Sequence, residues 1–233
     1  MVKEGYTFGL PLLAFAIPAL ISRTPIGVPL GIVLVLLAMF VFSFFRDPER
    51  VIPAEAGAVV SPGDGRVVVV TDEECEGRPG KRVSIFLAVW NVHVNRSPAA
   101  GIITKVEYRP GKFLAAMMER ASMENEQNVF TLSTDAGEIV FKQIAGLIAR
   151  RVVSWKKMGD KVARGERIGL VRFGSRVDLW VPKDAEILVK VGENVKGGSS
   201  VLARWPAQTA AGTLDGSSKA ETDANLTTTG KRS

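Results

Sequence analysis

The chain of 233 residues contains one cysteine and one histidine. A single cysteine excludes an internal disulfide framework and any metal site built from several thiolates. A single histidine likewise excludes the metal sites that use several imidazoles, and we therefore expect no metal. The chain also lacks a nucleotide-binding loop. Any reaction at neutral pH must depend on the few reactive side chains that remain.

The chain carries 30 Lys and Arg residues against 24 Asp and Glu residues, a formal net charge of +6. A surplus of positive charge suits an anionic partner, either a membrane surface or a nucleic acid. Nucleic acid is the weaker alternative, because the basic residues lack interleaved aromatic side chains on a recognisable module. The mean hydropathy is +0.16 although 23% of the residues are charged. The apolar residues must therefore be segregated along the chain.

These apolar residues gather near the N-terminus. The stretch 26–45 has no charged residue, and about 20 apolar residues span a bilayer core as a helix. Its fourteen Ile, Val, Leu and Phe residues favour insertion by about 4–8 kcal/mol before Gly, Pro and Ser are subtracted. The stretch 6–21 contains Pro11 and Pro18, which favours a kinked or re-entrant segment. We predict a membrane anchor of one or two hydrophobic helices over 1–50, with two buried core helices as the alternative.

From position 51 the chain changes to short β-branched runs separated by Gly, Pro and Asp, a pattern typical of an all-β sandwich or barrel. The predicted strands are Arg66–Thr71, Arg82–Val89, Ile102–Tyr108, Val129–Leu132, Glu138–Ile144, Ile168–Phe173, Val177–Val181 and Glu186–Val191. A helix is predicted over 112–125, because four apolar side chains there have near-helical spacing. Those side chains, which pack in a core or meet acyl chains, are Phe113, Leu114, Met117 and Met118.

A ten-residue pattern occurs twice, as Gly159-x-x-Val162-x-x-Gly165-x-x-Ile168 and as Gly192-x-x-Val195-x-x-Gly198-x-x-Val201. Each copy reads as a glycine turn, a buried valine, a second glycine turn and a strand start, as in lipoyl/biotinyl-type β-sandwiches. We therefore predict a mainly β fold over 51–206, a lipoyl/biotinyl-like β-sandwich with one or two helices that follows an α-helical membrane anchor. The tail 207–233 has almost no large apolar residue and is predicted to be disordered.

Three short segments carry the remaining candidates for chemistry. His93 is the only side chain whose unperturbed pKa lies near neutrality, unless it is a strand-end histidine satisfied by the backbone. Asp64, in the turn Ser61–Gly65, either closes that turn or orients an imidazole. Gly174 and Ser175 form a hairpin corner, or a strained peptide whose carbonyl the serine hydroxyl attacks with histidine as the base. The residues alone leave these alternatives open.

Seven motifs, which cover nearly all of 44–182, resemble in sequence and in order the short bacterial and archaeal form of phosphatidylserine decarboxylase. They are Phe44-Phe45-Arg46-Asp47-Pro48, Ser61-Pro62-Gly63-Asp64-Gly65, His93-Val94-Asn95-Arg96-Ser97-Pro98, Pro110-Gly111-Lys112-Phe113, Glu124-Asn125-Glu126-Gln127-Asn128, Gln143-Ile144-Ala145-Gly146 and Arg172-Phe173-Gly174-Ser175-Arg176-Val177-Asp178. The chain departs from the family at two positions. Gly63 stands where alanine is more usual, and Arg96 stands where the longer members have a second histidine.

The resemblance implies a proenzyme that cuts itself between Gly174 and Ser175. By analogy, Asp64 orients His93, and His93 takes the proton of Ser175 as its Oγ attacks the Gly174 carbonyl. Elimination and hydrolysis then convert Ser175 into a covalent pyruvoyl group. This group forms a Schiff base with the serine amine of phosphatidylserine, and decarboxylation yields phosphatidylethanolamine and CO2. The pyruvoyl group replaces an external cofactor.

The resemblance also implies that fragments 1–174 and 175–233 remain associated. The enzyme is expected at the cell (inner, cytoplasmic) membrane, in contact with membrane lipids, with its catalytic domain on the cytoplasmic face. A homodimer and an archaeal ether lipid as substrate (archaetidylserine) stay open. A membrane-tethered lipoyl-like carrier or adaptor is the rival class, but its modifiable lysine has only poor candidates in Lys183 and Lys190. A membrane-bound serine peptidase, a third alternative, would keep Ser175 intact.

Overall fold

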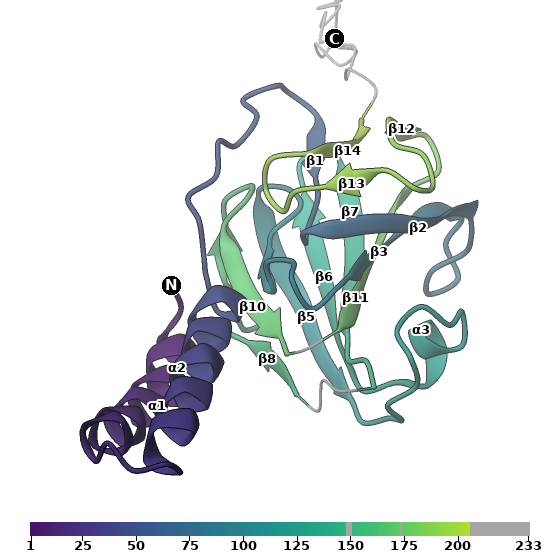
Figure 1. Cartoon of the computed structure of the whole chain (residues 1–233). Helices are drawn as coiled ribbons and strands as arrows, with labels where there is room; N and C mark the ends of the chain where they lie inside the picture. Colours follow the sequence, from purple (N-terminus) through teal and green to yellow (C-terminus); the bar gives the residue numbers. More distant parts are fainter. Residues whose placement is uncertain (148–150, 173, 206–233) are drawn as a thin grey trace, which may run out of the picture.

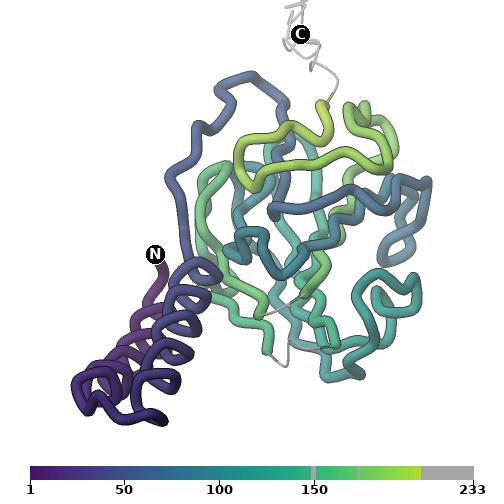
Figure 2. Tube along the Cα trace, in the orientation of Figure 1, coloured from purple at the N-terminus to yellow at the C-terminus, as the bar shows by residue number. Residues whose placement is uncertain are grey.

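The computed structural model describes residues 1–147, 151–172 and 174–205. It consists of an N-terminal helical hairpin and a β domain, and the hairpin projects from one side of that domain (Figures 1 and 2). The tail predicted for 207–233 lies outside the described residues.

The hairpin is formed by helices α1 (Lys3–Ile21) and α2 (Gly27–Phe44), which lie side by side (Figure 1). By length and composition both helices are able to cross a membrane. Helix α1 continues through Pro11 and Pro18, and prolines are tolerated in helices of this apolar kind. The first apolar stretch therefore forms a full helix, and the segment predicted to be an anchor consists of two helices.

Small residues let the two helices approach each other closely. A Cβ atom at Gly9 would lie 2.4 Å from the ring of Phe42, and one at Gly31 would lie 2.5 Å from the side chain of Leu20. The outward surface is apolar and exposed, with Phe15 71% exposed. A contiguous apolar surface of this kind marks an interaction site rather than a soluble exterior. The hairpin is consistent with membrane association and is not the core of the β domain.

The β domain contains three antiparallel sheets in its described residues. The largest has the strand order β13-β2-β3-β11-β7-β6-β5-β9, and the smaller two are β1-β14-β12 and β4-β10-β8. The strands are β1 (Ala58–Val60), β2 (Gly65–Asp72), β3 (Gly80–Leu87), β4 (Val94–Arg96), β5 (Gly101–Arg109), β6 (Gln127–Thr134), β7 (Gly137–Ile144), β8 (Val152–Ser154), β9 (Lys161–Val162), β10 (Arg167–Val171), β11 (Ser175–Pro182), β12 (Glu186–Ile187), β13 (Asn194–Val195) and β14 (Val201–Arg204).

The large sheet curls around an apolar core (Figure 1). Alternate residues of its strands point inward, and Ile85, Val177 and Leu179 are fully buried there. The rings of Phe130 and Phe141 stack across β6 and β7 at a centroid distance of 4.8 Å. Burial of each such side chain contributes roughly 1.5–3 kcal/mol to the free energy of folding. The mainly β fold predicted from the sequence is confirmed.

The repeated glycine pattern corresponds to two copies of one structural unit. Gly159, Gly165, Gly192 and Gly198 all have φ between 75° and 99°, a backbone conformation that favours glycine. The valine between each pair of glycines lies on a short strand, β9 or β13, and is at most 5% exposed. The strands β10 and β14 follow. The sequence pattern thus predicted both the turns and the burial correctly.

The helix predicted over 112–125 is wrong for most of its length. Only α3 (Ala121–Glu124) is helical. Asn125 explains the difference, because its side chain accepts a hydrogen bond from the Leu114 amide and donates one to the Leu114 carbonyl. These bonds replace those that a continuous helix would supply, and Lys112 instead forms a bridge with Asn125.

Candidate active site

Ser175 is the first residue of β11, where its Cα pairs with that of Leu87 on β3. Because it lies two residues before the inward-facing Val177, its side chain also points toward the interior of the sheet. Ser175 is fully buried, and its Oγ has no hydrogen-bond partner among the described residues. A buried hydroxyl without a partner costs free energy. It is also a nucleophile that no competing hydrogen bond restrains.

The preceding peptide is held in an unusual conformation. Gly174 has φ +61°, a left-handed conformation that costs other residues about 1–2 kcal/mol. A Cβ atom at Gly146 would lie only 1.9 Å from the carbonyl oxygen of Gly174. The absence of a side chain at Gly146 therefore allows the Gly174 carbonyl to pack against the end of β7. Phe173, the next residue upstream, lies outside the described residues.

Gly146→Ala is expected to slow any cleavage after Gly174 at least tenfold and to destabilise the fold by about 1–3 kcal/mol, the usual cost of an added methyl group in a packed site. The added carbon must displace the Gly174 carbonyl. The time course of fragment formation, followed by mass spectrometry, measures the effect. Gly77→Ala is the control, because Gly77 has φ +78° with no atom within 4 Å of an added Cβ. Normal cleavage in Gly146→Ala would contradict a role for this packing.

His93 lies immediately before β4, and its imidazole is only 2% exposed. Its Nδ1 lies 2.9 Å from the Asn91 carbonyl oxygen, and this contact places the proton on Nδ1, which donates to that oxygen. Nε2 is buried and has no hydrogen-bond partner in the described part of the chain. Burial, with a smaller contribution from the charge of Arg46, lowers the pKa of His93 to about 4. At neutral pH the imidazole is an uncharged base with a free lone pair on Nε2.

The backbone of His93 is hydrogen-bonded to the segment that leads into Ser175. The Val171 amide donates a hydrogen bond to the His93 carbonyl at 3.3 Å. Val171 ends β10, four residues before Ser175, and β10 pairs with β4. The base and the hydroxyl therefore lie on segments that are joined both by strand pairing and by a short stretch of chain.

The end of the helical hairpin forms one wall of this site. The rings of Phe44 and His93 lie 4.1 Å apart between centroids, and Phe44 is 2% exposed. Arg46 Nη2 donates a hydrogen bond to the Trp90 carbonyl at 2.7 Å. Trp90 belongs to the same loop as Asn91, which holds the imidazole. The membrane-type helix α2 thus continues directly into the surroundings of the candidate base.

Asp64 is nearly buried and is held by two groups other than His93. Its Oδ2 accepts a hydrogen bond from Arg50 Nη2 at 2.7 Å, and its Oδ1 accepts one from the Gly197 amide at 2.7 Å. In this structure the Asn91 carbonyl, rather than Asp64, orients the imidazole. Asp64 instead ties the turn at the start of β2 to the glycine turn that precedes β14. A direct role of Asp64 toward His93 stays a prediction.

A chain of buried amides crosses the inner face beside Ser175. Gln143 Nε2 donates to Asn95 Oδ1 at 2.8 Å, and Asn128 Nδ2 donates to Gln143 Oε1 at 3.4 Å. Gln143 pairs with Val177, two residues from Ser175. Asn95 Nδ2 is buried and without a partner among the described residues. Among the described residues, the interior beside Gln143 therefore contains an unused hydrogen-bond donor.

The opposite face of β11 carries a buried ion pair. Arg176 Nε donates to Asp178 Oδ1 at 2.5 Å, and Arg176 Nη2 donates to Ser84 Oγ at 2.8 Å. Ser122 Oγ donates to the other carboxylate oxygen of Asp178. Both charged side chains are fully buried, and removal of one partner from such a pair typically costs about 3–5 kcal/mol. The network fixes the strand immediately after Ser175.

Four of these positions were not assigned roles from the sequence. Phe44, Asn95 and Gly146 belong to the motifs that resemble the decarboxylase family, but their contacts join segments distant in the chain. Asn91 lies two residues before His93, and only its backbone carbonyl is used. Every residue type has a backbone carbonyl, so the identity of residue 91 does not indicate this contact. For Asn95 the sequence did contain a signal. Asn95 lies two residues after His93, and residues two apart in an extended segment point to the same face.

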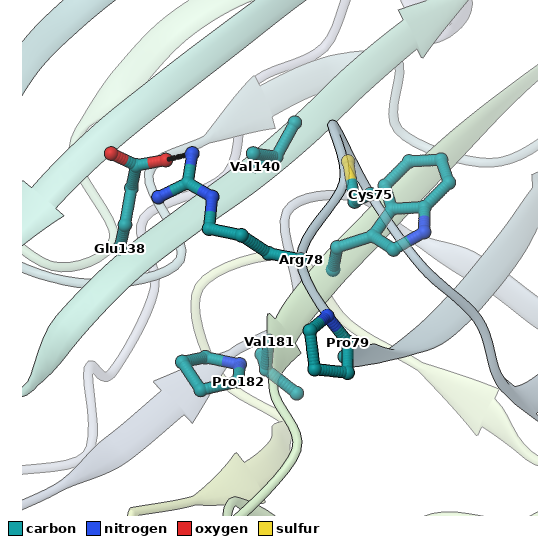
Figure 3. Close-up of a pocket in the computed structure, with 9 residues that line it drawn as sticks. Cys75, Arg78, Pro79, Glu138, Val140, Val181 and Pro182 are labelled. Atoms are coloured by element: carbon teal, nitrogen blue, oxygen red, sulfur yellow. Dashed lines mark hydrogen bonds and ion pairs between the residues drawn. The ribbon is translucent and has the colours of Figure 1, made fainter.

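A cavity of about 170 Å³ lies at the C-terminal end of β11, whereas Ser175 is at its start (Figure 3). Its lining includes Trp180 and Pro182 of β11, together with Cys75 and Arg78. Strand geometry places Trp180 about 17 Å from Ser175 along β11. Burial raises the pKa of the Cys75 thiol, which keeps the thiol protonated at neutral pH. This cavity is separate from the candidate active site.

Comparison with known proteins identifies relatives over most of the chain. The family model for phosphatidylserine decarboxylase matches residues 37–203. A phosphatidylserine decarboxylase proenzyme of Symbiobacterium thermophilum is 48% identical over 210 residues, which cover 88% of this chain and 96% of that protein. The proenzyme of Solibacter usitatus is 50% identical over 204 residues, with the same shares. That of Burkholderia pseudomallei is 44% identical over 211 residues, 89% of this chain and 96% of that protein.

Proposed function

Because the chain belongs to the phosphatidylserine decarboxylase family, we propose that it converts phosphatidylserine into phosphatidylethanolamine and CO2 after cutting itself between Gly174 and Ser175. The observation that carries this proposal is the buried Ser175 hydroxyl, which has no hydrogen-bond partner among the described residues. It follows a left-handed Gly174, four residues after Val171, whose amide is hydrogen-bonded to the carbonyl of the neutral base His93.

The self-cleavage uses groups of the chain alone. Ser175 Oγ attacks the Gly174 carbonyl carbon while His93 Nε2 takes the hydroxyl proton. The peptide C–N bond breaks, the amine of residue 175 is released, and an ester joins the two residues. Loss of the Cα proton of residue 175 then expels the Gly174 carboxylate and leaves dehydroalanine. Addition of water and loss of ammonia yield a pyruvoyl group at position 175.

The residues around Ser175 fit such a group. A pyruvoyl group has no hydroxyl, and the Oγ that it would lose makes no hydrogen bond in the described structure. Asn95 Nδ2, on the buried amide chain that includes Gln143, is a donor without a described partner, and we infer that it serves the carbonyl oxygen of the group. The group supplies a carbonyl that binds the substrate amine and accepts the electron pair left by CO2. In the proposed reaction, His93 returns a proton to the product.

The strand pairing supports continued association of the fragments 1–174 and 175–233. The strand β11 belongs to the second fragment but lies between β3 and β7 of the first. The ion pair of Arg176 with Asp178 lies within the second fragment, while Ser84 and Ser122 of the first bind it. Cleavage therefore leaves a central strand of the sheet in place.

The domain division that we propose follows the functions of the parts. Residues 1–50 form the anchor, 51–206 form the catalytic domain, and the remaining tail 207–233 takes no part in the reaction. The substrate never leaves the bilayer, so an enzyme held at the membrane surface by α1 and α2 meets it directly. We place the catalytic domain on the cytoplasmic face of the cell membrane.

Reductive trapping tests the proposal. Purified enzyme treated with borohydride in the presence of phosphatidylserine is expected to carry the lipid on the fragment that begins at position 175, because only this fragment has the carbonyl. Intact-mass spectrometry of both fragments measures the result. Borohydride without the lipid is the control and adds only hydrogen to the same fragment. Trapping on fragment 1–174, or on an unbroken chain, would overturn the proposal.

A further inference from the structure

Two of the four tryptophans of the chain are exposed. Trp90 is 77% exposed and Trp155 is 39% exposed, whereas Trp180 and Trp205 are only 4% and 6% exposed. Neither exposed ring is used in the proposed self-cleavage or in the core of the β domain. Both lie at the base of the helical hairpin, each beside the end of one helix.

Trp90 lies at the level where α2 ends. Arg46 Nη1 donates a hydrogen bond at 2.7 Å to the carbonyl of Ser43, in the last turn of α2. Arg46 Nη2 donates another at 2.7 Å to the Trp90 carbonyl. The backbone of Trp90 is therefore separated from the last turn of α2 by the width of one guanidinium group.

Trp155 lies beside the start of α1. It lines the same pocket as Met1, Val2 and Lys3, the residues at which this helix begins. The Val2 amide donates a hydrogen bond to the Phe45 carbonyl at 3.1 Å. The start of α1 and the end of α2 thus lie together at the end of the hairpin nearest the β domain (Figure 1).

The lengths of the two helices locate the bilayer surface at this end of the hairpin. Helix α1 has 19 residues and α2 has 18, so each is about 27–29 Å long at the usual rise per residue. The hydrocarbon core of a bilayer is about 30 Å thick. A hairpin that crosses this core therefore places Trp90 and Trp155 at the lipid–water boundary, where tryptophan is enriched.

A basic side chain lies at the same level. The Arg172 guanidinium is 5.2 Å from the ring centroid of Phe8, in the second turn of α1. Among the described residues, Arg172 Nε has no hydrogen-bond partner and no carboxylate forms an ion pair with Arg172. A cation at this depth attracts the negative surface of a bilayer. Arg172 also lies three residues before Ser175, so this contact would bring the approach to the cleavage point to the membrane.

We propose that the β domain itself binds the surface of an anionic bilayer, with the rings of Trp90 and Trp155 in the lipid–water boundary and the Arg172 guanidinium on lipid phosphate groups. The partner is the lipid surface and not one particular headgroup. The inference rests on the proposed anchoring by α1 and α2, and it adds a second contact that does not depend on the substrate. Position 172 then lies at the level of the headgroups.

Quenching by brominated lipids measures the depth of the tryptophans. We expect the full chain, bound to vesicles of phosphatidylcholine and phosphatidylglycerol, to be quenched more by bromine near the headgroup than by bromine near the chain ends. The double variant Trp90→Phe/Trp155→Phe is expected to lose at least two thirds of this quenching. Trp205→Phe, which removes a buried ring, is the control and is expected to keep it. Unchanged quenching in the double variant, or stronger quenching by the deeper bromine, would overturn the proposal.

Charge reversal tests the phosphate contact. Arg172→Glu is expected to reduce the quenching at least twofold, because a carboxylate is repelled by lipid phosphates, and Arg172→Lys is expected to retain it. Lys183→Glu makes the same change of charge at an exposed position just beyond the C-terminal end of β11 and is expected to have no effect. Quenching that is the same in Arg172→Glu as in the unmodified protein would overturn the role of Arg172.

Co-sedimentation with the same vesicles separates this inference from the proposals on which it rests. A chain that co-sediments without tryptophan quenching would overturn the contact of the β domain alone. A chain that does not co-sediment would overturn both the anchor and this contact. Neither measurement involves turnover, so a quenched protein without decarboxylase activity would support the contact and overturn the proposed function.

Discussion

Ser175→Ala is expected to accumulate as one uncut chain of 233 residues and 25.1 kDa with no decarboxylase activity. The substitution removes the only group that attacks the Gly174 carbonyl in the proposed mechanism. The fold is expected to persist, because Ser175 Oγ makes no hydrogen bond to a described residue. Loss of an unpartnered buried hydroxyl is close to neutral for stability. Intact-mass spectrometry and a thermal melt measure the two outcomes.

Thr131→Val provides the matched control. Thr131 is also buried, and its Oγ1 also lacks a described hydrogen-bond partner. It lies on β6, which is separated from β11 by β7. This variant is expected to yield the fragments 1–174 and 175–233 at the normal rate. Fragments of normal mass from Ser175→Ala would show that another residue performs the cleavage, and the assignment of Ser175 would be wrong.

The sequence singled out candidate reactive residues, but it did not indicate the groups that contact them in the structure. His93 was conspicuous because it is the single histidine, and Ser175 followed from a motif seven residues long. The roles of Phe44 and Gly146 depend on contacts with His93 and Gly174, which lie far from them in the chain. Such contacts arise only when the sheet has formed, and a single sequence contains no direct record of them.

For Asp64, too, the sequence predicted the local position but not the distant hydrogen-bond partners. Its position in a turn before a strand was predicted, and β2 begins at the next residue. Its hydrogen-bond partners, Arg50 and Gly197, lie 14 and 133 residues away. Local spacing indicates that an aspartate is placed at a strand end, but it does not indicate which distant group meets the carboxylate. The helix predicted over 112–125 failed for a similar reason, because one amide side chain redirected the backbone.

The position of the proposed cut leaves the strand that follows it paired within the sheet. The proposed scission precedes β11, a central strand with a partner on each side. The new chain end is followed immediately by the buried pair of Arg176 and Asp178. A charge buried in this way resists fraying, because exposing one partner without the other is costly. Position 175 therefore keeps its place after the covalent link to 174 is lost.

His93→Ala is expected to slow self-cleavage by about 10²–10⁴-fold, the usual contribution of a positioned general base. The unmodified protein has the imidazole neutral at pH 7, because burial and the charge of Arg46 lower the pKa of His93 to about 4. Pulse-labelled chains, sampled over time and resolved by size, give the rate constants. A normal rate in His93→Ala would remove the imidazole from the self-cleavage step.

The pH profile follows from the direction of the pKa shift. A base acts in its unprotonated form, so the cleavage rate depends on the fraction of neutral His93. With a pKa of about 4, that fraction is nearly constant from pH 8 to pH 5 and falls to half near pH 4. We therefore expect a rate constant that is flat across the neutral range. If the histidine were unburied, the cleavage rate would instead fall to half near pH 6.5.

Phe44→Ala tests whether burial against the Phe44 ring lowers the pKa of His93. The Phe44 ring lies 4.1 Å from the His93 ring, and its removal admits water, which stabilises the charged form. The pKa of His93 is then expected to rise from about 4 toward 6.5, and the midpoint of the cleavage profile should rise with it. The rate at pH 8 should change little, because the imidazole is neutral there in both proteins. A midpoint that stays near pH 4 in Phe44→Ala would show that the anchor does not control the base.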